Sequence, residues 1–219
     1  MKNATELVMI IDKSGSMYGL ESDTIGGFNS MLNEQKAKEG ECRITTVLFD
    51  NTYELLHDRI DIRAVHPMTK KDYQTGGSTA LLDAIGKTIH KIDAVQESTD
   101  EEYRADKVIF VIITDGLENA SNAYSLAEIR KEIRQHREKD WQFIFLGANI
   151  DAVETADAFG IDREMAADYV SDGEGTRLNY TAISKAVSDF RMNDCISWDV
   201  LETVRGDMKK RGKSRRNRH

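Results

Sequence analysis

The 219 residues are 40% hydrophobic and 31% charged, with a net charge of −8; this balance suits a folded globular protein and excludes wholesale disorder. The two cysteines, Cys42 and Cys195, form no CxxC pair and have no histidine partner at metal-ligand spacing, which excludes a disulfide framework and a zinc knuckle and favours a reducing, cytoplasmic location. The apolar run at residues 7–11 is too short for a signal peptide or a membrane span, so we expect no membrane partner.

The first third of the chain predicts a strand, a helix and a hairpin. The apolar run 7–11 indicates a buried strand, and Ile25, Phe28 and Leu32 follow with the spacing of one helix face. Two further strands are predicted at 43–49 and 53–57. Because only three residues separate them, they must pair antiparallel, which places the strand at 53–57 at an edge of the sheet.

The middle of the chain predicts a buried parallel strand between two helices. A glycine-rich loop at 75–79 opens a helix whose apolar face carries Leu82, Ile85, Ile89 and Ile92. Residues 108–113 are apolar at every position, which is typical of a central parallel strand covered on both faces. Ser125 and Glu128 form a capping-box pattern at the start of the next helix.

The last third predicts a strand at 141–147, a helix that begins near Asp151 and ends at Gly160, and a short strand at 166–170. A final helix follows around residues 183–190, which could continue through Trp198 and Leu201. Strands that alternate with helices predict an α/β fold: a doubly wound, mostly parallel six-stranded sheet with one antiparallel edge strand and helices on both faces.

The charge is unevenly distributed along the chain. Residues 205–219 hold eight Lys or Arg and one acid, and the preceding residues hold 22 basic and 37 acidic side chains, a balance of −15. We therefore expect a single domain over residues 1–204 and a basic, disordered C-terminal tail over residues 205–219. A contact of this tail with nucleic acid, or with the acidic domain itself, is the alternative.

Oxygen-bearing side chains follow two of the predicted strands and open one helix. In a doubly wound sheet, ligands bind at the carboxyl ends of the strands, where successive crossovers leave to opposite sides. If the strands ending near residues 12 and 114 are neighbours, the candidate residues can converge on one point. They are Asp12, Ser14, Ser16, Thr79 and Asp115.

This set contains two carboxylates and three hydroxyls, without nitrogen or sulfur. Hard cations prefer such ligands, so we expect Mg²⁺, with Mn²⁺ or Ca²⁺ as substitutes, and we do not expect zinc. Three neutral hydroxyls would leave the ion strongly electrophilic. An open coordination position would then attract an acidic oxygen from outside, which suits capture better than catalysis.

Three segments, Asp12-Lys13-Ser14-Gly15-Ser16, Gly76-Gly77-Ser78-Thr79 and Thr114-Asp115-Gly116, resemble the metal-ion-dependent adhesion site of von Willebrand factor type A (vWA) domains. The resemblance covers roughly residues 5–200 and implies a Rossmann-like fold. It further implies that the three hydroxyls of the set contact the ion directly or through one water, that the two aspartates act largely through bound waters, and that a partner protein supplies an Asp or Glu. Intracellular bacterial members of the family often work beside AAA+ ATPases or stress-response proteins.

Other interpretations of the same residues remain open. Short polar residues after a strand can be a simple turn, and Thr79 can cap the following helix. A metal-dependent hydrolase could use the same ion to activate water, but both aspartates would be committed to the ion, and no general base is evident. A scaffold with a vestigial site is a third possibility. We expect a protein-interaction module that is not an enzyme.

Overall fold

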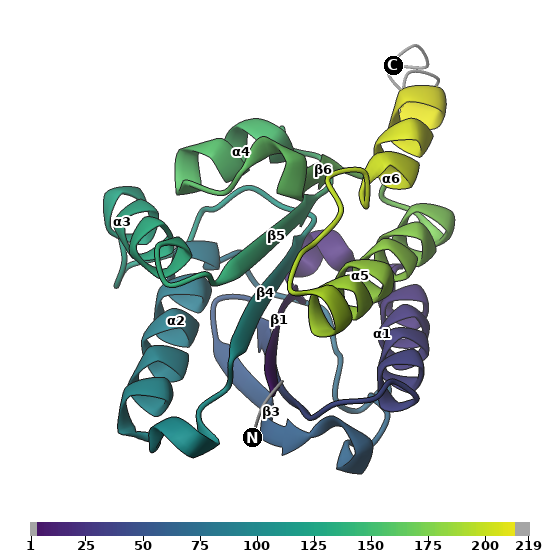
Figure 1. The fold of residues 1–219 in the computed structure, drawn as a ribbon. Coiled ribbons are helices and arrows are strands. Elements are labelled where there is room, and N and C mark those ends of the chain that lie inside the picture. Colours follow the sequence, from purple (N-terminus) through teal and green to yellow (C-terminus); the bar gives the residue numbers. More distant parts are fainter. Residues whose placement is uncertain (1–3, 213–219) are drawn as a thin grey trace.

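The computed structural model describes residues 4–212. At the centre of this part of the chain lies a six-stranded sheet in the order β3-β2-β1-β4-β5-β6 (Figure 1). The strands are β1 (Thr5–Asp12), β2 (Cys42–Phe49), β3 (Tyr53–Asp61), β4 (Lys107–Thr114), β5 (Gln142–Gly147) and β6 (Ala166–Asp168). The predicted α/β class with six strands is confirmed.

The hairpin of β2 and β3 is the antiparallel part of the sheet. The other strand pairs in the sheet are parallel, and β3 lies at the edge as predicted. Asp50 holds the tight turn, since its carboxylate accepts a hydrogen bond of 2.6 Å from Thr52 N. β3 extends beyond the predicted residue 57 because the pairing continues through register shifts between Ile44 and Val47.

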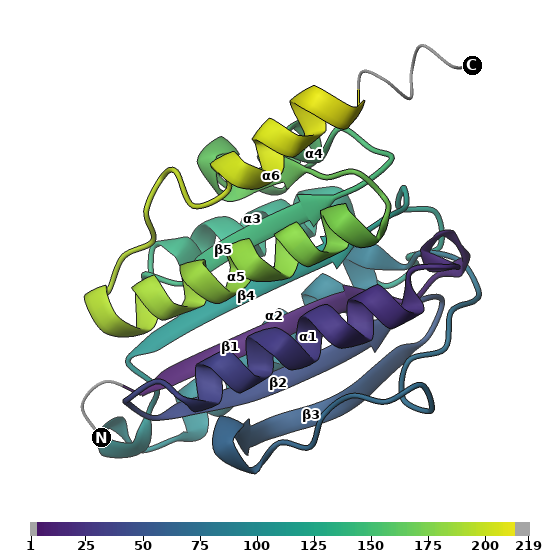
Figure 2. The same ribbon diagram turned by 90° about the vertical axis from the view of Figure 1, so that its right-hand side faces the viewer.

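Helices cover both faces of the sheet, as predicted (Figures 1 and 2). The helices are α1 (Glu21–Lys36), α2 (Leu81–Ser98), α3 (Leu126–Arg137), α4 (Ala152–Phe159), α5 (Gly173–Asn193) and α6 (Glu202–Asp207). Side chains of α1, α5 and α6 share one core cluster with the sheet, and those of α2, α3 and α4 share the other. Among residues 4–212, no helix is both long and apolar enough to cross a membrane.

Local sequence signals account for several helix ends. Ser125 and Glu128 form the predicted capping box at the start of α3. Asp151 caps α4 by accepting a hydrogen bond from Glu154 N, and Gly160 ends that helix in the left-handed conformation, with φ 86°. These predicted boundaries are confirmed.

The expected continuation of the final helix through Trp198 and Leu201 is wrong. α5 ends at Asn193, because Asp194 adopts the left-handed conformation with φ 59° and turns the chain away. Leu201 is nevertheless buried in the core, whereas Trp198 lies 70% exposed in the intervening loop. The apolar spacing that suggested a longer helix is therefore divided between a loop and the start of α6.

Residues 205–212, which we expected in a disordered tail, are helical. They form the end of α6 and a π-helical turn over Met208–Gly212. Arg211 anchors this turn, because its guanidinium forms ion pairs with Asp207 and, at 2.7 Å, with Asp172 at the start of α5. The other residues of the predicted tail, 213–219, lie outside the described residues.

β1 and β4 are neighbours, which is the arrangement that the predicted site requires. The chain leaves β1 through α1 on one face of the sheet and leaves β4 through α3 on the other. The two strands therefore diverge at a topological switch point, and the residues that follow them border a crevice at the carboxyl edge of the sheet.

Candidate metal site

Asp12 ends β1 and is completely buried between the neighbouring strands. Its carboxylate accepts hydrogen bonds from Ser14 N at 2.6 Å and from Thr114 Oγ1 at 2.7 Å. Burial raises the pKa of this carboxyl group, and the hydrogen bonds from Thr114 and Ser14 offset part of that rise. Asp12 is therefore held in one orientation at the base of the site.

Two loops are tied together above Asp12. Gly15 N donates to Gly77 O at 3.1 Å, and Gly76 N donates to Lys13 O at 2.8 Å. Gly77 has φ 71°, and a Cβ at this position would lie 2.1 Å from the side-chain oxygen of Asn51. Only glycine meets both conditions, so the glycine-rich segment brings the loop after β1 to the start of α2.

The three predicted hydroxyl ligands converge next to Gly116. Ser14 Oγ and Ser16 Oγ lie 3.0 Å apart. A Cβ placed on Gly116 would lie 3.0 Å from Thr79 Oγ1, 3.1 Å from Ser16 Oγ and 3.9 Å from Ser14 Oγ. The hydroxyls from two separate segments therefore border one small space, which the absence of a side chain at Gly116 keeps open.

Thr79 does not cap α2 with its side chain. The N-cap residue is Ala80, without a side-chain cap. The backbone of Thr79 is instead held by Asn119, whose Oδ1 accepts a hydrogen bond of 2.9 Å from Thr79 N. This contact ties the start of α2 to the loop after β4 and leaves the Thr79 hydroxyl directed at the site.

Asp115 is 1% exposed and follows β4 directly. One carboxylate oxygen accepts a hydrogen bond from Asn149 Nδ2, and the other accepts one from Ser171 Oγ. Burial raises the pKa of Asp115, the negative charge of Asp12 raises it further, and the two hydrogen bonds act in the opposite direction. A cation between the two carboxylates would relieve their repulsion.

The residues present fit a hard divalent cation. All five predicted side chains, Asp12, Ser14, Ser16, Thr79 and Asp115, lie around the crevice at the ends of β1 and β4. Ser14, Ser16 and Thr79 would hold the ion, with the two buried carboxylates behind them. No group of three or more His, Cys, Asp or Glu side chains arranged to hold a metal occurs within residues 4–212, so the hydroxyls are essential to this candidate.

Four further residues position the site. The sequence did not indicate Asn119, Asn149 and Ser171, and it placed Thr114 in the third resembling segment without giving it a role. Thr114 ends β4, and Asn149 and Ser171 follow β5 and β6 closely. A polar side chain close to the carboxyl end of a parallel strand is the signal that Thr114, Asn149 and Ser171 share, although an ordinary turn gives the same pattern. Asn149 also has φ 56°, a left-handed conformation that Asn tolerates better than most residues.

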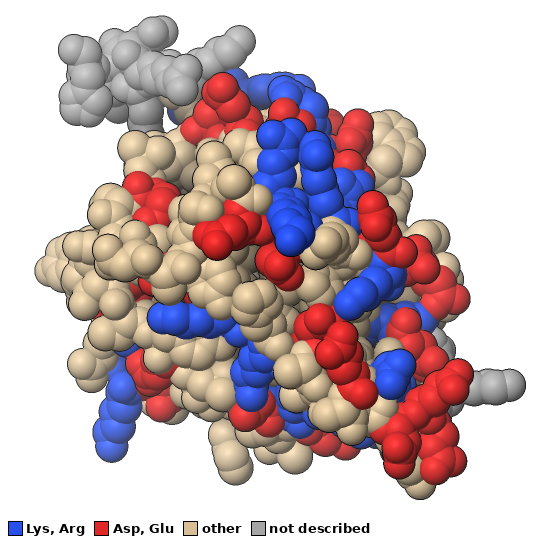
Figure 3. Space-filling model, turned by 90° about the vertical axis from the view of Figure 1, so that its left-hand side faces the viewer, with Lys and Arg blue, Asp and Glu red and all other residues tan. Residues whose placement is uncertain are grey.

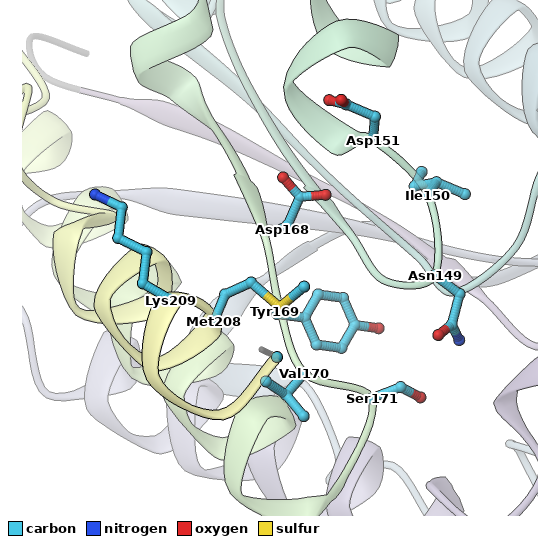
Figure 4. Close-up of a pocket in the computed structure, with 10 residues that line it drawn as sticks. Asn149, Ile150, Asp151, Asp168, Tyr169, Val170, Ser171, Met208 and Lys209 are labelled. Carbon is cyan, nitrogen blue, oxygen red and sulfur yellow. The ribbon is translucent and has the colours of Figure 1, made fainter. Parts of the chain in front are cut away.

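A cavity of about 650 Å³ lies beside Asp115's partners. Its lining comes from the loop before α4, from β6 and the residues after it, and from the π-helical turn. Asn149 and Ser171 lie at one end of the lining and Lys209 lies at the other (Figure 4). The C-terminal helical segment therefore borders the same edge of the sheet as the candidate metal site.

Neither protein-family models nor curated protein sequences match this chain, whereas several solved structures align with it. A von Willebrand factor type A protein from Catenulispora acidiphila aligns with a TM-score of 0.59 and 14% identity, over 85% of this chain and 43% of that one. Proximal thread matrix protein 1 from the mussel byssus, with a zinc-occupied MIDAS (metal-ion-dependent adhesion site) motif, aligns with a TM-score of 0.59 and 14% identity, over 85% and 46%.

The manganese-loaded TRAP protein of Plasmodium vivax aligns with a TM-score of 0.52 and 19% identity, over 66% of this chain and 57% of that one. The chain thus spans about half the length of these proteins. At identities this low, the alignments establish the fold alone. The alignments, the strand order and the antiparallel edge strand together show that the chain has the Rossmann-like fold of von Willebrand factor type A domains.

Proposed function

We propose that this chain is a Mg²⁺-dependent protein-interaction module. In this proposal Ser14, Ser16 and Thr79 hold the ion, the carboxylates of Asp12 and Asp115 support it, and a carboxylate of a partner protein completes its coordination. The ion supplies the positive charge that captures this acidic group.

One observation carries the proposal: three hydroxyl oxygens from two segments border a single space beside Gly116, with two buried carboxylates next to them. Buried carboxylates without a compensating cation are costly, and here burial raises the pKa of both. The relatives named above with zinc and manganese in their structures support a divalent ion. The choice of Mg²⁺ rests on the oxygen-only ligand set.

Binding is a better fit than catalysis. Both oxygens of Asp115 already accept hydrogen bonds, and Asp12 accepts three, from Ser14 N, Thr114 Oγ1 and Asp115 N. In this proposal both carboxylates support the ion, so neither is assigned to take a proton from an attacking water, which is what a hydrolase would need.

The partner and the compartment are also proposals. The resemblance described above suggests an AAA+ ATPase or a stress-response protein as the source of the acidic residue. Cys42 and Cys195 are both free thiols, which suits a cytoplasmic protein because disulfides seldom form there.

Isothermal titration of Mg²⁺ into the metal-free protein tests the proposed ion site. We expect one site in the wild type and at least about tenfold weaker binding in Thr79→Val, which keeps the shape of the side chain and removes its hydroxyl. Thr176→Val is the matched control, because the buried Thr176 hydroxyl has no hydrogen-bond partner within the described chain. Equal binding by wild type and Thr79→Val, or no binding at all, would contradict the proposal.

Capture of a purified partner protein tests the proposed binding of a partner's carboxylate to the ion. We expect binding in Mg²⁺, release in EDTA, and loss when one Asp or Glu of the partner is replaced by Ala. Unchanged binding in EDTA would instead support the scaffold with a vestigial site.

A further inference from the structure

An apolar groove runs along the surface beside the candidate metal site. It encloses about 430 Å³ between the starts of α2 and α3 and the side of α4, a size within the roughly 300–1,000 Å³ of typical ligand-binding clefts. The large apolar residues of its lining are Leu81, Leu82, Leu117, Leu126, Ile150 and Phe159.

Two leucines of this groove are unusually exposed. Leu117 is 68% exposed and Leu126 is 45% exposed, although both belong to the described, well-packed part of the chain. On the face of the molecule shown in Figure 3, uncharged side chains cover much of the left part, whereas Lys, Arg, Asp and Glu gather on the right. Contiguous exposed apolar surface next to polar residues is typical of an interaction site.

The groove is preformed by hydrogen bonds from its own loop. Glu118 accepts hydrogen bonds from Leu82 N at 2.9 Å and from Ser121 N at 2.7 Å. Asp83 accepts further bonds from the backbone of Ala123 at 2.9 Å and of Tyr124 at 3.0 Å. The loop after β4 is thereby fixed onto the start of α2, so little conformational freedom is lost when a ligand binds.

Gly116 connects the groove with the metal site. It belongs to the lining of the groove, and its missing Cβ is the point around which the Thr79 and Ser16 hydroxyls gather. Asp151 and Glu154 belong to the same lining. A ligand in the groove can therefore lie next to the metal site and contact both leucine side chains and acidic residues.

We propose that this groove binds the apolar side chains next to the acidic residue in a partner's segment, and that a basic residue of the same segment faces Asp151 and Glu154. The inference rests on the proposed function, since the acidic residue is the one held by the ion. Large apolar side chains fill the space above Leu117 and Leu126, and the stem of a Lys or Arg can lie on apolar surface while its charge reaches the carboxylates. The ion binds a carboxylate, and the groove restricts binding to carboxylates that have large apolar neighbours.

Selection from a displayed library of random 12-residue peptides tests this inference. With immobilised wild type in Mg²⁺, we expect enriched sequences that combine Asp or Glu with a neighbouring large apolar residue and a Lys or Arg. With Leu117→Gln/Leu126→Gln, the acidic residue should persist and the apolar preference should disappear. With Glu154→Lys, the basic preference should disappear.

The outcomes separate the two proposals. Enrichment of acidic residues without apolar neighbours, or an unchanged apolar preference in the double variant, would overturn the groove and leave the metal-dependent function standing. Enrichment without any acidic residue, or identical enrichment in EDTA, would overturn the proposed function itself. Met192→Gln is the matched control, because Met192 is 64% exposed and does not line the groove; circular dichroism and thermal unfolding of each variant confirm that it is folded.

Discussion

Thr114 Oγ1 donates a hydrogen bond of 2.7 Å to the carboxylate of Asp12, across 102 positions of sequence. This contact joins the ends of β4 and β1 and orients the carboxylate behind the three hydroxyls. In Thr114→Val the shape of the side chain is kept and the donor is lost. We expect the affinity for Mg²⁺ to fall about 10–100-fold, as is usual when a group that orients a metal site is removed.

Thr114→Ser keeps the hydroxyl and is the control for this prediction. Its affinity, measured by the same calorimetric titration, should stay within about threefold of the wild type, since the donor remains. A Val variant that binds Mg²⁺ as tightly as the Ser variant would show that the hydrogen bond does not position Asp12 for the ion.

Asp115→Asn should make the metal-free protein more stable. Burial and the charge of Asp12 raise the pKa of Asp115 in the folded protein. The protonated carboxyl group therefore contributes stability below the pKa that Asp115 has in the unfolded chain, and this stability is lost as the pH rises through the folded pKa. At pH 7 the ionised carboxylate is therefore a cost, which a neutral amide removes. The new amide oxygen still accepts from one of Asn149 and Ser171, and the other can reorient to accept from the new NH₂ group.

The same variant should not be stabilised by Mg²⁺. At 100 times its Kd, the ion stabilises the wild type by about 2.7 kcal/mol, which is roughly 5–10 °C in Tm for a domain of this size. Thermal unfolding with and without Mg²⁺ measures both effects. A variant less stable than the metal-free wild type would show that the two hydrogen bonds to Asp115 outweigh its burial.

The sequence was sufficient to place the five candidate side chains at one edge of the sheet, because their spacing, after two strands and before one helix, carries the signal; that they bind an ion stays a prediction. It was not sufficient for Asn149 and Ser171, because a single polar residue after a strand is equally typical of any turn. The end of α5 could not be predicted either: the left-handed conformation of Asp194 interrupts apolar spacing that is compatible with a longer helix. In the sequence, Arg211 is one residue of a basic run, and its ion pair with Asp172 forms only because the fold brings the two together.

Acid should destabilise the protein partly through His57. The ring is 7% exposed, stacks on Phe28 with centroids 6.1 Å apart, and lies 3.0 Å from Thr46 Oγ1 through Nδ1. Burial lowers the pKa of His57, and the charge of Asp72 offsets part of this effect. The unfolded chain therefore binds the proton first, and stability that is present above about pH 6.5 is lost as the pH falls through and below that value.

Urea unfolding between pH 7.5 and pH 5.5 measures this dependence. His57→Gln should reduce the slope of unfolding free energy against pH by at most about 1.4 kcal/mol for each pH unit, the limit for one proton. Met192→Gln, at an exposed and uncharged position, is the control and should leave the slope unchanged. Equal slopes for wild type and His57→Gln would exclude His57 as the source.

The two cysteines should differ sharply in reactivity. Cys42 is buried, and burial raises the pKa of its thiol to about 12, whereas Cys195 is exposed. Because the thiolate is the reactive form, Ellman's reagent at pH 8 should modify one thiol per native chain and two in guanidinium chloride. Cys195→Ser should reduce the native count to zero, and rapid modification of two thiols in the native wild type would contradict the buried position of Cys42.

Gly116→Ala should block the ion without disturbing the fold. Gly116 does not have a positive φ, so the backbone accepts alanine, but the new methyl group would lie 3.0 Å from Thr79 Oγ1 and 3.1 Å from Ser16 Oγ. The methyl occupies the space that the hydroxyls border. We therefore expect at least about tenfold weaker Mg²⁺ binding, with circular dichroism and metal-free Tm close to those of the wild type.

Gly76→Ala is the matched control for this variant. Gly76 belongs to the same site, yet a Cβ there meets nothing within 4 Å and its φ is not positive. Its hydrogen bond to Lys13 O uses only the backbone, so this variant should bind Mg²⁺ as the wild type does. If both alanine variants bind equally well, the space beside Gly116 is not where the ion sits, and the hydroxyls of Ser14, Ser16 and Thr79 face one another for structural reasons alone.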